Sequence, residues 1–353
     1  MQVNRLFCSA FRNLKKTEII PDEEMNVICG ENAQGKTNIL EALWLFTGAK
    51  SFRATKENSF IKFGQQKAII ELDFKAFGIS SNIRQEFSEK RSVYLNGKQL
   101  PSPSKLAGNF GAVIFSPDDL AIVKDGPNIR RKFLDTAIGQ LYPNYIEILR
   151  SYMRAVTQRN KIIKDYKYDT SLSIMLDVFE KEISNCAEKI IKYRKNYLEN
   201  LDVFVSKIYE ELSCGKEEFM SVYVANTCDI IRQRLHDSRK EDMYTGVTSV
   251  GPHRDDIDFK INGISARSFG SQGQQRSVAL SLKLAQAEVS KSKTGEYPII
   301  LLDDVMSELD VMRQNFILNH IKGKQSFITC CDPNSVERLK KGKIINVKTG
   351  EVF

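Results

Sequence analysis

The sequence contains no run of about 18 consecutive apolar residues, the length from which a transmembrane helix is recognised. Its first residues, which include Arg5, also lack the apolar core of a secretory signal. We therefore expect a cytoplasmic protein that has no membrane partner.

Cysteine pairs with the spacing of metal ligands are also missing. The 7 cysteines are odd in number and include no C-x-x-C pair, and there are only 3 histidines. A disulfide framework, a structural zinc site and a His-rich catalytic metal site are therefore not expected. We interpret the cysteines as small apolar residues of the core.

Internal repeats and low-complexity tracts are absent as well. The 353 residues are 42% hydrophobic and 27% charged, which is typical of a globular chain with two lobes or a domain that carries a large insertion. The net charge of +8 allows nucleic acid or an acidic membrane as a partner, but by itself it establishes neither.

Apolar runs and alternating patterns occupy both ends of the chain, and long helical patterns occupy the middle. The pairs Asn96-Gly97 and Asn262-Gly263 indicate tight hairpin turns. A helix with the apolar stripe Val278, Leu282, Ala285 and Val289 precedes the last strands. Strands are predicted at residues 25–29, 68–74, 83–87, 92–95, 112–115, 256–261, 298–302 and 326–329.

This alternation predicts an α/β fold in which the two ends of the chain build one sheet around a helical insertion. We place the first part of the sheet domain at residues 1–125. The helical arm follows at 126–245, and the second part of the sheet domain occupies 246–353.

The strongest motif is G-E-N-A-Q-G-K-T, which matches G-x-x-x-x-G-K-[ST] between a buried strand and a helix. Its glycines let backbone N–H groups surround phosphates, and we expect Lys36 to reach the β- and γ-phosphates of ATP. We expect Thr37 to supply a hydroxyl to Mg²⁺. The alternative is a turn with an incidental Lys-Thr pair. The predicted ATP-binding residues of this loop are Gly30, Glu31, Asn32, Ala33, Gln34, Gly35, Lys36, Thr37 and Asn38.

Two carboxylates follow the apolar run 299–302. We predict that Asp303 binds Mg²⁺ together with Thr37, and that Asp304 orients or deprotonates the attacking water. These are the predicted catalytic residues. The alternative is a pair of acids that caps the end of a strand.

With these motifs in place, the chain resembles the ABC-type ATPase heads of SMC-type proteins. The stretch Ser271 to Gln275 resembles their signature loop, and Ser307 to Asp310 resembles their D-loop. More narrowly, the chain resembles the RecF family of bacterial recombination mediators. The segments that carry this second resemblance are 11–14, 115–120, 126–135, 158–160 and 251–256.

The chain departs from the pattern of such heads at several positions. Ala33 stands where they usually have Gly, and Asp304 stands where Glu is commoner, which predicts slow hydrolysis. No Gln occurs between Ser116 and Leu120, where such heads carry a glutamine. No His follows Thr329 in the place of a switch histidine.

The resemblance implies that two subunits sandwich two ATP molecules. Ser271, Gly273 and Gln274 would then bind the nucleotide held by the partner subunit, and Arg53 would lie near the nucleotide. The alternative for Ser271 is a helix N-cap that forms a capping box with Gln274. The alternative for Arg53 is a solvated surface arginine.

Basic residues interleaved with tyrosines mark a candidate DNA-binding segment in the helical arm. A solvated helix face is the alternative interpretation. Tyr152, Tyr166, Lys167 and Tyr168 accompany these basic residues. The predicted DNA-binding residues are Arg150, Arg154, Arg159, Lys161 and Lys164.

A second basic cluster consists of Arg130, Arg131 and Lys132. It could also contact DNA. It is equally consistent with a helix start that has only a local structural role.

The resemblance implies an ATP-dependent DNA-binding protein of recombinational repair and replication-gap processing. Its partners would be double-stranded, gapped or single-stranded DNA, a second copy of the chain bound through ATP, and RecR, RecO and RecA. A slow DNA-dependent ATPase activity, with ATP and Mg²⁺ as cofactors, would serve ATP-gated DNA binding.

Two other classes of protein share parts of this pattern. An ABC transporter subunit has the same loops, but its carboxylate strand lies much nearer the phosphate loop and it requires a membrane partner. An SMC-like structural or nuclease head requires a long heptad arm and a zinc hook, and neither pattern occurs here.

Overall fold

The central sheet has six strands in the order β15-β14-β3-β13-β12-β8. All neighbouring strands are parallel except the pair β14 and β15. Continuous, fully buried apolar runs form β12 and β8, as expected for parallel strands that are covered on both faces. In sheet order the strands span Glu351–Val352, Lys343–Lys348, Met25–Cys29, Ser326–Cys330, Ile299–Leu302 and Ala112–Phe115.

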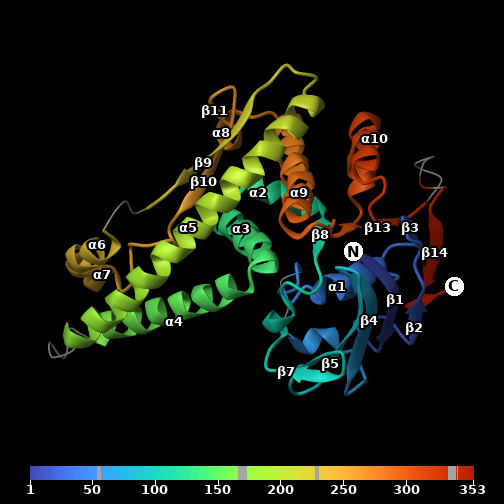
Figure 1. Ribbon diagram of the computed structural model, residues 1–353, viewed down its shortest axis with the longest axis horizontal. Helices are drawn as coiled ribbons and strands as arrows, with labels where there is room; N and C mark the ends of the chain where they lie inside the picture. The colour runs from blue at the N-terminus through green and yellow to red at the C-terminus, as the bar shows by residue number, and fades with distance from the viewer. Residues whose placement is uncertain (54–56, 166–172, 227–229, 333–338, 340) are drawn as a thin grey trace. The chain divides into compact units, whose positions relative to one another are not determined.

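Both ends of the chain contribute to this sheet, as the sequence predicts (Figure 1). Strands β3 and β8 come from the first third of the chain, and the other four come from the last 60 residues or so. The C-terminal strands β14 and β15 were not predicted, because their alternation is short and their charged residues face solvent.

A second sheet of six strands is antiparallel throughout, in the order β2-β1-β4-β5-β6-β7. Its hairpin turn at Asn96 and Gly97 has φ angles of 48° and 78°, which is the left-handed turn predicted from this pair. In sheet order the strands span Thr17–Ile19, Gln2–Ser9, Ala68–Ala76, Ile79–Phe87, Ser92–Leu95 and Lys98–Leu100.

Helix α1 (Lys36–Leu45) packs between the two sheets and begins at the end of the phosphate loop. Ile39, Leu40 and Leu43 are fully buried in one apolar cluster that also contains residues of both sheets. Most of the helix is therefore buried, and its first residues are fixed in position by the core behind them.

The computed structural model describes residues 1–353 except 54–56, 166–172, 227–229, 333–338 and 340. The chain divides into two compact units. The first contains Met1–Asp119 and Leu280–Phe353, and the second contains Leu120–Ala279. The second unit includes the predicted arm at 126–245 and extends beyond it at both ends.

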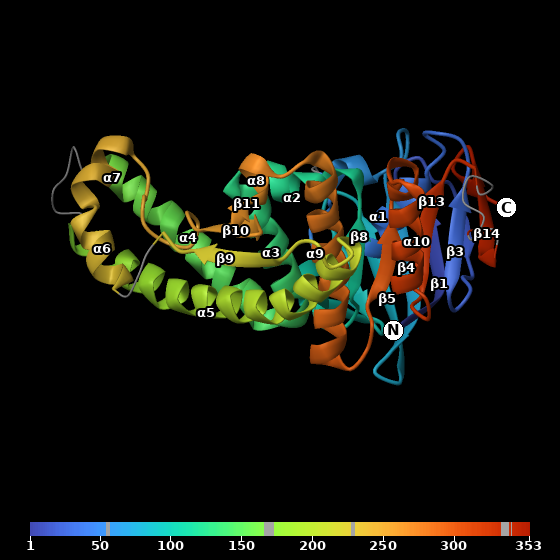
Figure 2. The ribbon, with the colours of Figure 1, turned by 90° about the horizontal axis from the view of Figure 1, so that it is seen from above.

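In the second unit the long helices α4 (Pro143–Asp165) and α5 (Ser173–Leu212) pack side by side (Figure 2). A sheet in the order β11-β10-β9 accompanies them, formed by Ile264–Ser265, Asp256–Ile261 and Phe219–Val224. Strand β9 lies within the region that the sequence predicts to be helical. The other helices of this unit are α2 Ala121–Lys124, α3 Pro127–Leu141, α6 Ile231–Asp237, α7 Arg239–Thr245 and α8 Ala266–Phe269.

Helix α9 (Gln272–Thr294) begins in the second unit and ends in the first. Its predicted stripe, Val278, Leu282, Ala285 and Val289, is fully buried. Helix α10 spans Val311–His320, and 3-10 turns occur at Glu57–Phe60, Pro103–Leu106, Pro117–Leu120 and Val305–Glu308. Within the described residues, no helix combines the length and the apolar character needed to cross a membrane.

Candidate nucleotide-binding site

The phosphate loop connects β3 to α1 and depends on backbone conformations with positive φ. Gly30 has a φ of 159°, and a Cβ atom there would stand 2.3 Å from the carbonyl oxygen of Val347. Gly35 has a φ of 117°, and a Cβ atom there would stand 2.7 Å from Oδ1 of Asn13. Ala33 adopts a φ of 65°, so this small residue keeps the turn at a cost of about 1 kcal/mol.

Lys36 is buried under the loop and bonds to the loop's own carbonyl groups. Its Nζ donates to the carbonyl oxygens of Gly30, at 2.7 Å, and Glu31, at 3.0 Å. Only 4% of the residue is exposed. These contacts hold an ammonium group inside a loop that points N–H groups inward, which makes the loop a site for an anion.

Thr37 and Asp303 meet at the ends of α1 and β12. The Thr37 hydroxyl donates to Oδ1 of Asp303 at 2.9 Å, and the hydroxyl of Thr329 lies 3.1 Å from the same oxygen. Burial raises the pKa of Asp303, although the hydrogen bond from Thr37 acts in the opposite direction. A hydroxyl and a buried carboxylate that already touch are a donor set that suits Mg²⁺, which prefers oxygen ligands.

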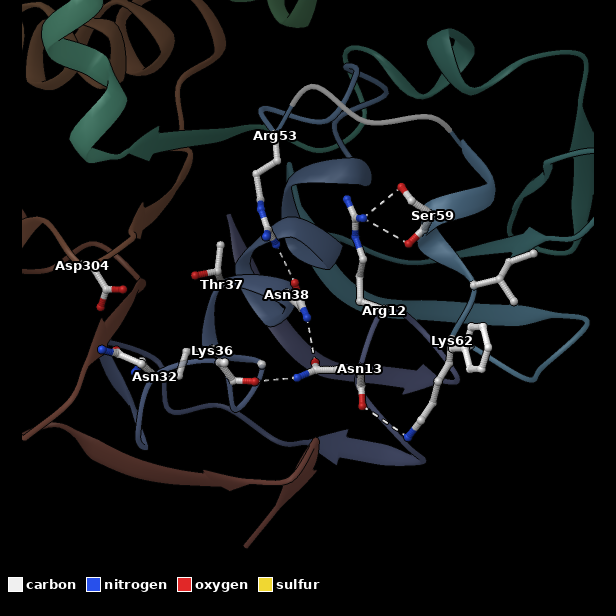
Figure 3. A pocket seen from close by; sticks show the side chains of 14 residues that line it. Arg12, Asn13, Asn32, Lys36, Thr37, Asn38, Arg53, Ser59, Lys62 and Asp304 are labelled. Atoms are coloured by element: carbon white, nitrogen blue, oxygen red, sulfur yellow. Dashed lines mark hydrogen bonds between the residues drawn. The ribbon is translucent and has the colours of Figure 1, made fainter.

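Asp304 follows directly and has a left-handed backbone, with a φ of 52°. Its backbone N–H donates to the hydroxyl of Thr329 at 2.8 Å. A non-glycine residue in this conformation costs energy, and such strain is common where a side chain is aimed for function. The turn directs the Asp304 side chain into the same cavity as Lys36 and Thr37 (Figure 3).

The segment before the loop, Arg12 and Asn13, supports it from the side. Asn13 donates to the carbonyl oxygen of Ala33 at 2.9 Å and accepts from the amide of Asn38 at 2.7 Å. Arg12 makes a two-pronged ion pair with the buried carboxylate of Glu41, with distances of 2.9 and 2.8 Å. The loop and helix α1 are therefore tied to the same short segment.

Arg53 lies over the start of α1, as Figure 3 shows. Its guanidinium donates to Oδ1 of Asn38 at 2.7 Å and lies 3.8 Å from Glu41. The residue remains exposed on its outer side. Arg53 is therefore not a purely solvated surface arginine, because its side chain contacts Asn38 and lines the cavity.

The cavity above the loop has a volume of about 660 Å³. Lys36, Thr37 and Asp304 line one part of it, and Ile61 and Phe63 line another. The Phe63 side chain is fully exposed. The cavity has the size and polarity gradient of a site for a ligand with a charged end and a flat apolar end.

Ser271 belongs to the second unit, where it caps helix α9. The backbone N–H of Gln274 donates to Oγ of Ser271 at 3.2 Å, and the backbone N–H of Ser271 donates to the Gln274 side chain at 2.7 Å. These are the two reciprocal bonds of a capping box, so the predicted capping role is confirmed. Gly273 lies between them in the first turn of the helix.

Four of the five predicted DNA-binding residues are exposed on helix α4: Arg150, Arg154, Lys161 and Lys164. Their charged groups are therefore accessible to phosphates. Tyr166, Lys167 and Tyr168 lie outside the described residues. Tyr152 is buried and its hydroxyl contacts Nδ1 of His253 at 2.5 Å, so it does not form a stacking surface.

The prediction for Arg159 is wrong. Its side chain is fully buried and pairs with Asp242 at 2.6 Å and with Glu180 at 3.0 Å. It also donates to the carbonyl oxygen of Leu235 at 2.9 Å. Its hydrogen-bonding capacity is used inside the unit, where it ties α4 to α5 and α7, and no phosphate can reach it.

Arg130, in the second basic cluster, is also buried. It forms a two-pronged ion pair with Asp256, at 2.6 and 2.9 Å, and donates to the carbonyl oxygen of Asp125 at 2.7 Å. This residue has the local structural role that was the alternative interpretation.

Sequence reasoning did not identify Arg12, Asn13, Glu41, Phe63 or Thr329 as residues of this site. Arg12, Asn13, Phe63 and Thr329 lie far along the chain from the motif that they support or face. Glu41 lies close to the motif, but its partner Arg12 is 29 residues away. The signal that was available is the segment 11–14, which was noted for its resemblance but not for a role.

Comparisons with known proteins agree with this geometry. The family model of the RecF/RecN/SMC N-terminal domain matches residues 2–351. The DNA replication and repair protein RecF of Agathobacter rectalis is 37% identical over 359 residues, which cover 100% of this chain and 99% of that protein. The protein of the same name from Thermoanaerobacter pseudethanolicus is 40% identical, with 97% of this chain and 96% of that protein covered.

Solved structures give the same result. A structure described as the recombination mediator protein RecF with ATP, in the RecFOR pathway, has a TM-score of 0.92 and 35% identity. The match covers 100% of this chain and 97% of that one. An Smc head domain from Pyrococcus furiosus, at 17% identity and a TM-score of 0.57 over 99% of this chain and 95% of that one, shares the fold alone. The chain belongs to the RecF family, within the wider family of RecF, RecN and SMC N-terminal domains.

Proposed function

We propose that this chain is an ATP-dependent DNA-binding protein of replication and recombinational repair, and that ATP binds in the cavity above the phosphate loop. The observation that carries the proposal is the 2.9 Å contact between the Thr37 hydroxyl and Asp303, next to the buried ammonium of Lys36. The Lys36 ammonium, the Thr37 hydroxyl and the Asp303 carboxylate lie close together there. These are the groups that a nucleoside triphosphate bound with Mg²⁺ requires. A cytoplasmic location is part of the proposal.

Lys36 exchanges the carbonyl groups of Gly30 and Glu31 for the β- and γ-phosphates when ATP enters. Thr37 and Asp303 hold Mg²⁺, which neutralises charge on the phosphates when it is bound. Asp303 would hold the cation in its ionised form, although burial raises the pKa of this carboxyl. Asn13 and Asn38 hold the loop at a fixed position relative to helix α1.

Asp304 orients the attacking water, and hydrolysis is slow. The side chain of Asp is one methylene shorter than that of Glu, so it reaches less far from the strand end. Thr329 fixes the backbone of Asp304 and gives the carboxylate a defined starting position. Slow hydrolysis suits a protein in which bound ATP is a signal, because the bound state then persists.

The apolar part of the cavity takes the adenine ring. Phe63 offers an exposed aromatic face and Ile61 an apolar edge, while Arg12 lines the region between this part and the loop. Stacking of a base on an aromatic ring is worth about 1–3 kcal/mol where it has been measured on nucleic-acid proteins.

Two copies of the chain share each ATP in the proposed complex. The capped N-terminus of α9, with Ser271 and Gly273, contacts the γ-phosphate of ATP held by the other copy. Arg53 of the copy that holds this ATP lies beside the same nucleotide. A capped helix terminus still presents N–H groups, so the capping box is compatible with an anion site. ATP joins the copies because only the triphosphate reaches both of them.

Double-stranded DNA, and gapped DNA with its single strands, binds to the exposed basic face of α4, formed by Arg150, Arg154, Lys161 and Lys164. RecR and RecO are the proposed protein partners, and loading of RecA is the proposed outcome. These partners follow from membership of a family whose relatives are named for replication and repair and whose solved relative is described in the RecFOR pathway.

Equilibrium ATP binding by the Lys36→Met variant tests the proposal. The variant should lose at least 100-fold in affinity and keep its fold, because the loop follows the end of β3 and residues 31–33 are exposed. Lys322→Met is the matched control, since Lys322 is an exposed lysine of the same unit at a distance from the cavity. If Lys36→Met still binds ATP with micromolar affinity, ATP does not bind in this cavity as proposed.

A further inference from the structure

Two cysteines face one another where β3 and β13 end. Cys29 and Cys330 are directly paired in the parallel register of these strands. Their sulfur atoms lie 3.3 Å apart and form a thiol hydrogen bond. Both residues are buried, with exposed fractions of 4% and 7%.

This arrangement can close into a disulfide with a shift of about 1 Å at the ends of the two strands. Adjacent strands lie about 4.8 Å apart, and bridged cysteines have Cα atoms about 4.4–6.8 Å apart, so the strand spacing falls inside the allowed range. The sulfur atoms need to approach by only about 1.2 Å to reach a bond length of about 2.05 Å.

The pair lies immediately beneath the phosphate loop. Cys29 precedes Gly30, whose carbonyl oxygen accepts the hydrogen bond from Lys36. Cys331 follows Cys330, and its sulfur lies 3.5 Å from Nζ of Lys36 and 3.2 Å from Oδ1 of Asn32. Both strand ends therefore touch the residues that would hold the phosphates.

We propose that Cys29 and Cys330 are an oxidation site, at which a peroxide closes a reversible disulfide that weakens ATP binding. The effect on ATP rests on the proposed function, whereas formation of the bond does not. The two thiols are then more than the inert core residues expected from the sequence.

The chemistry balances with one molecule of hydrogen peroxide. The sulfur of Cys29 attacks one peroxide oxygen, the O–O bond breaks, and the products are a sulfenic acid and water. The sulfur of Cys330 then displaces the hydroxyl group from the sulfenic acid as a second water, and the S–S bond forms. Two thiols lose two electrons and two protons, and the peroxide is reduced to two waters.

Cys29 is the better first nucleophile of the two. The hydrogen bond from Cys330 lowers the pKa of Cys29, and the nearby charge of Lys36 acts in the same direction. The same pairing and burial raise the pKa of Cys330. The thiolate is the attacking form of cysteine, so the pair has one attacking and one resolving sulfur.

The disulfide affects ATP binding because the start of the phosphate loop is too closely packed to move independently. Gly30 already lies so close to Val347 that a Cβ atom would clash at 2.3 Å. A sulfur drawn toward β13 pulls the Cys29 backbone and with it the Gly30 carbonyl that orients Lys36. Misplacement of a positioned group by about 1 Å can cost about 100-fold in function.

The test treats the whole chain, first reduced and then freed of reductant, with one equivalent of hydrogen peroxide. Peptide mass mapping should find residues 29 and 330 in one linked species. The Kd for ATP should rise at least tenfold, and dithiothreitol should restore both the free thiols and the original Kd.

Cys330→Ala should bind ATP as the reduced parent does and should no longer respond to peroxide. Cys214→Ser is the matched control, since Cys214 is an exposed cysteine of the other unit, and this variant should stay sensitive. Because the linked peptide is measured on the unaltered chain, the result does not depend on either variant.

Three outcomes would overturn the proposal. The first is the absence of the linked peptide, including the case in which only the exposed Cys331 is oxidised. The second is a linked species whose Kd for ATP stays within twofold of the reduced form. The third is a Cys330→Ala variant that loses ATP affinity on peroxide treatment as the parent does. If the reduced chain fails to bind ATP while the bond still forms, the proposed function fails and the oxidation site stands.

Discussion

Asn13 donates a hydrogen bond to the carbonyl oxygen of Ala33 at 2.9 Å. This contact joins the segment between strands β1 and β2 of the antiparallel sheet to the middle of the phosphate loop. The same side chain accepts from Asn38 on helix α1 at 2.7 Å. Asn13 therefore fixes the distance between the loop and the helix that follows it, and it holds Ala33 in its left-handed conformation.

Replacing Asn13 with Ala should weaken ATP binding by about tenfold, since the loss of one or two polar contacts is worth about 1–2 kcal/mol. Isothermal titration with ATP measures the effect. Asn109→Ala is the control, because Asn109 also bonds to backbone carbonyls of the first unit but does not line the cavity. Equal affinity in Asn13→Ala and the parent would mean that the loop holds its shape without this residue.

Asp303 should make the stability of the ATP-free chain depend on pH. Burial raises its pKa in the folded state, so the protonated form is the one that folding favours. This contribution to stability is fully present below the unfolded-state pKa and is lost as the pH rises through the folded-state pKa.

Asp303→Asn should therefore be more stable than the parent at neutral pH without nucleotide, and the difference should shrink as the pH falls through the folded-state pKa of Asp303. Chemical denaturation over a pH series measures this. The same variant should lose Mg²⁺-dependent ATP binding. A parent and variant of equal stability at every pH would show that the carboxylate carries no burial cost.

Asp304→Asn should bind Mg²⁺ and ATP as the parent does, through Thr37 and Asp303, but its hydrolysis rate should fall at least 100-fold. The reason is that an amide cannot take a proton from water or orient it as a carboxylate does. Phosphate release under single-turnover conditions is the measurement. Glu89→Gln serves as a comparison, because Glu89 is an exposed acid of the same unit that does not line the cavity. If Asp304→Asn hydrolyses ATP at the normal rate, another residue acts as the general base.

The double change Arg154→Glu and Lys161→Glu should weaken DNA binding and flatten its dependence on salt. Each phosphate contact that is lost releases one fewer counterion, so the slope of log K against log salt should fall by about 1–2. Lys195→Glu on helix α5 is a matched exposed control. An unchanged slope in the double variant would return these residues to a solvated helix face.

Local features of this fold were predictable because the residues involved are neighbours in the sequence. The capping box of Ser271 and Gln274, the turn at Asn96 and Gly97, and the phosphate loop between β3 and α1 all follow from residues within a few positions of one another. The pairing of Thr37 with Asp303 was also predicted, because a phosphate-loop site needs a carboxylate for Mg²⁺ and Asp303 follows an apolar strand.

The features that sequence reasoning missed depend on distant partners. Arg159 looked like a surface residue on a basic helix, yet its partner Asp242 lies 83 residues away. Strand β9 was missed in a predicted helical region because it pairs with β10, which lies more than 30 residues further along the chain. The residues next to Arg159 in the sequence gave no sign that α5 and α7 would cover it.

Sedimentation velocity, with duplex DNA and either ATP or ADP, tests most directly the claim that ATP joins two copies over DNA. The parent and Asp304→Asn should sediment as DNA-bound dimers with ATP, and the parent should remain monomeric with ADP. Ser271→Arg should bind ATP as a monomer and fail to dimerise. Sedimentation of the parent at the same rate with ATP and with ADP, or dimerisation of Ser271→Arg as strong as that of the parent, would contradict the account.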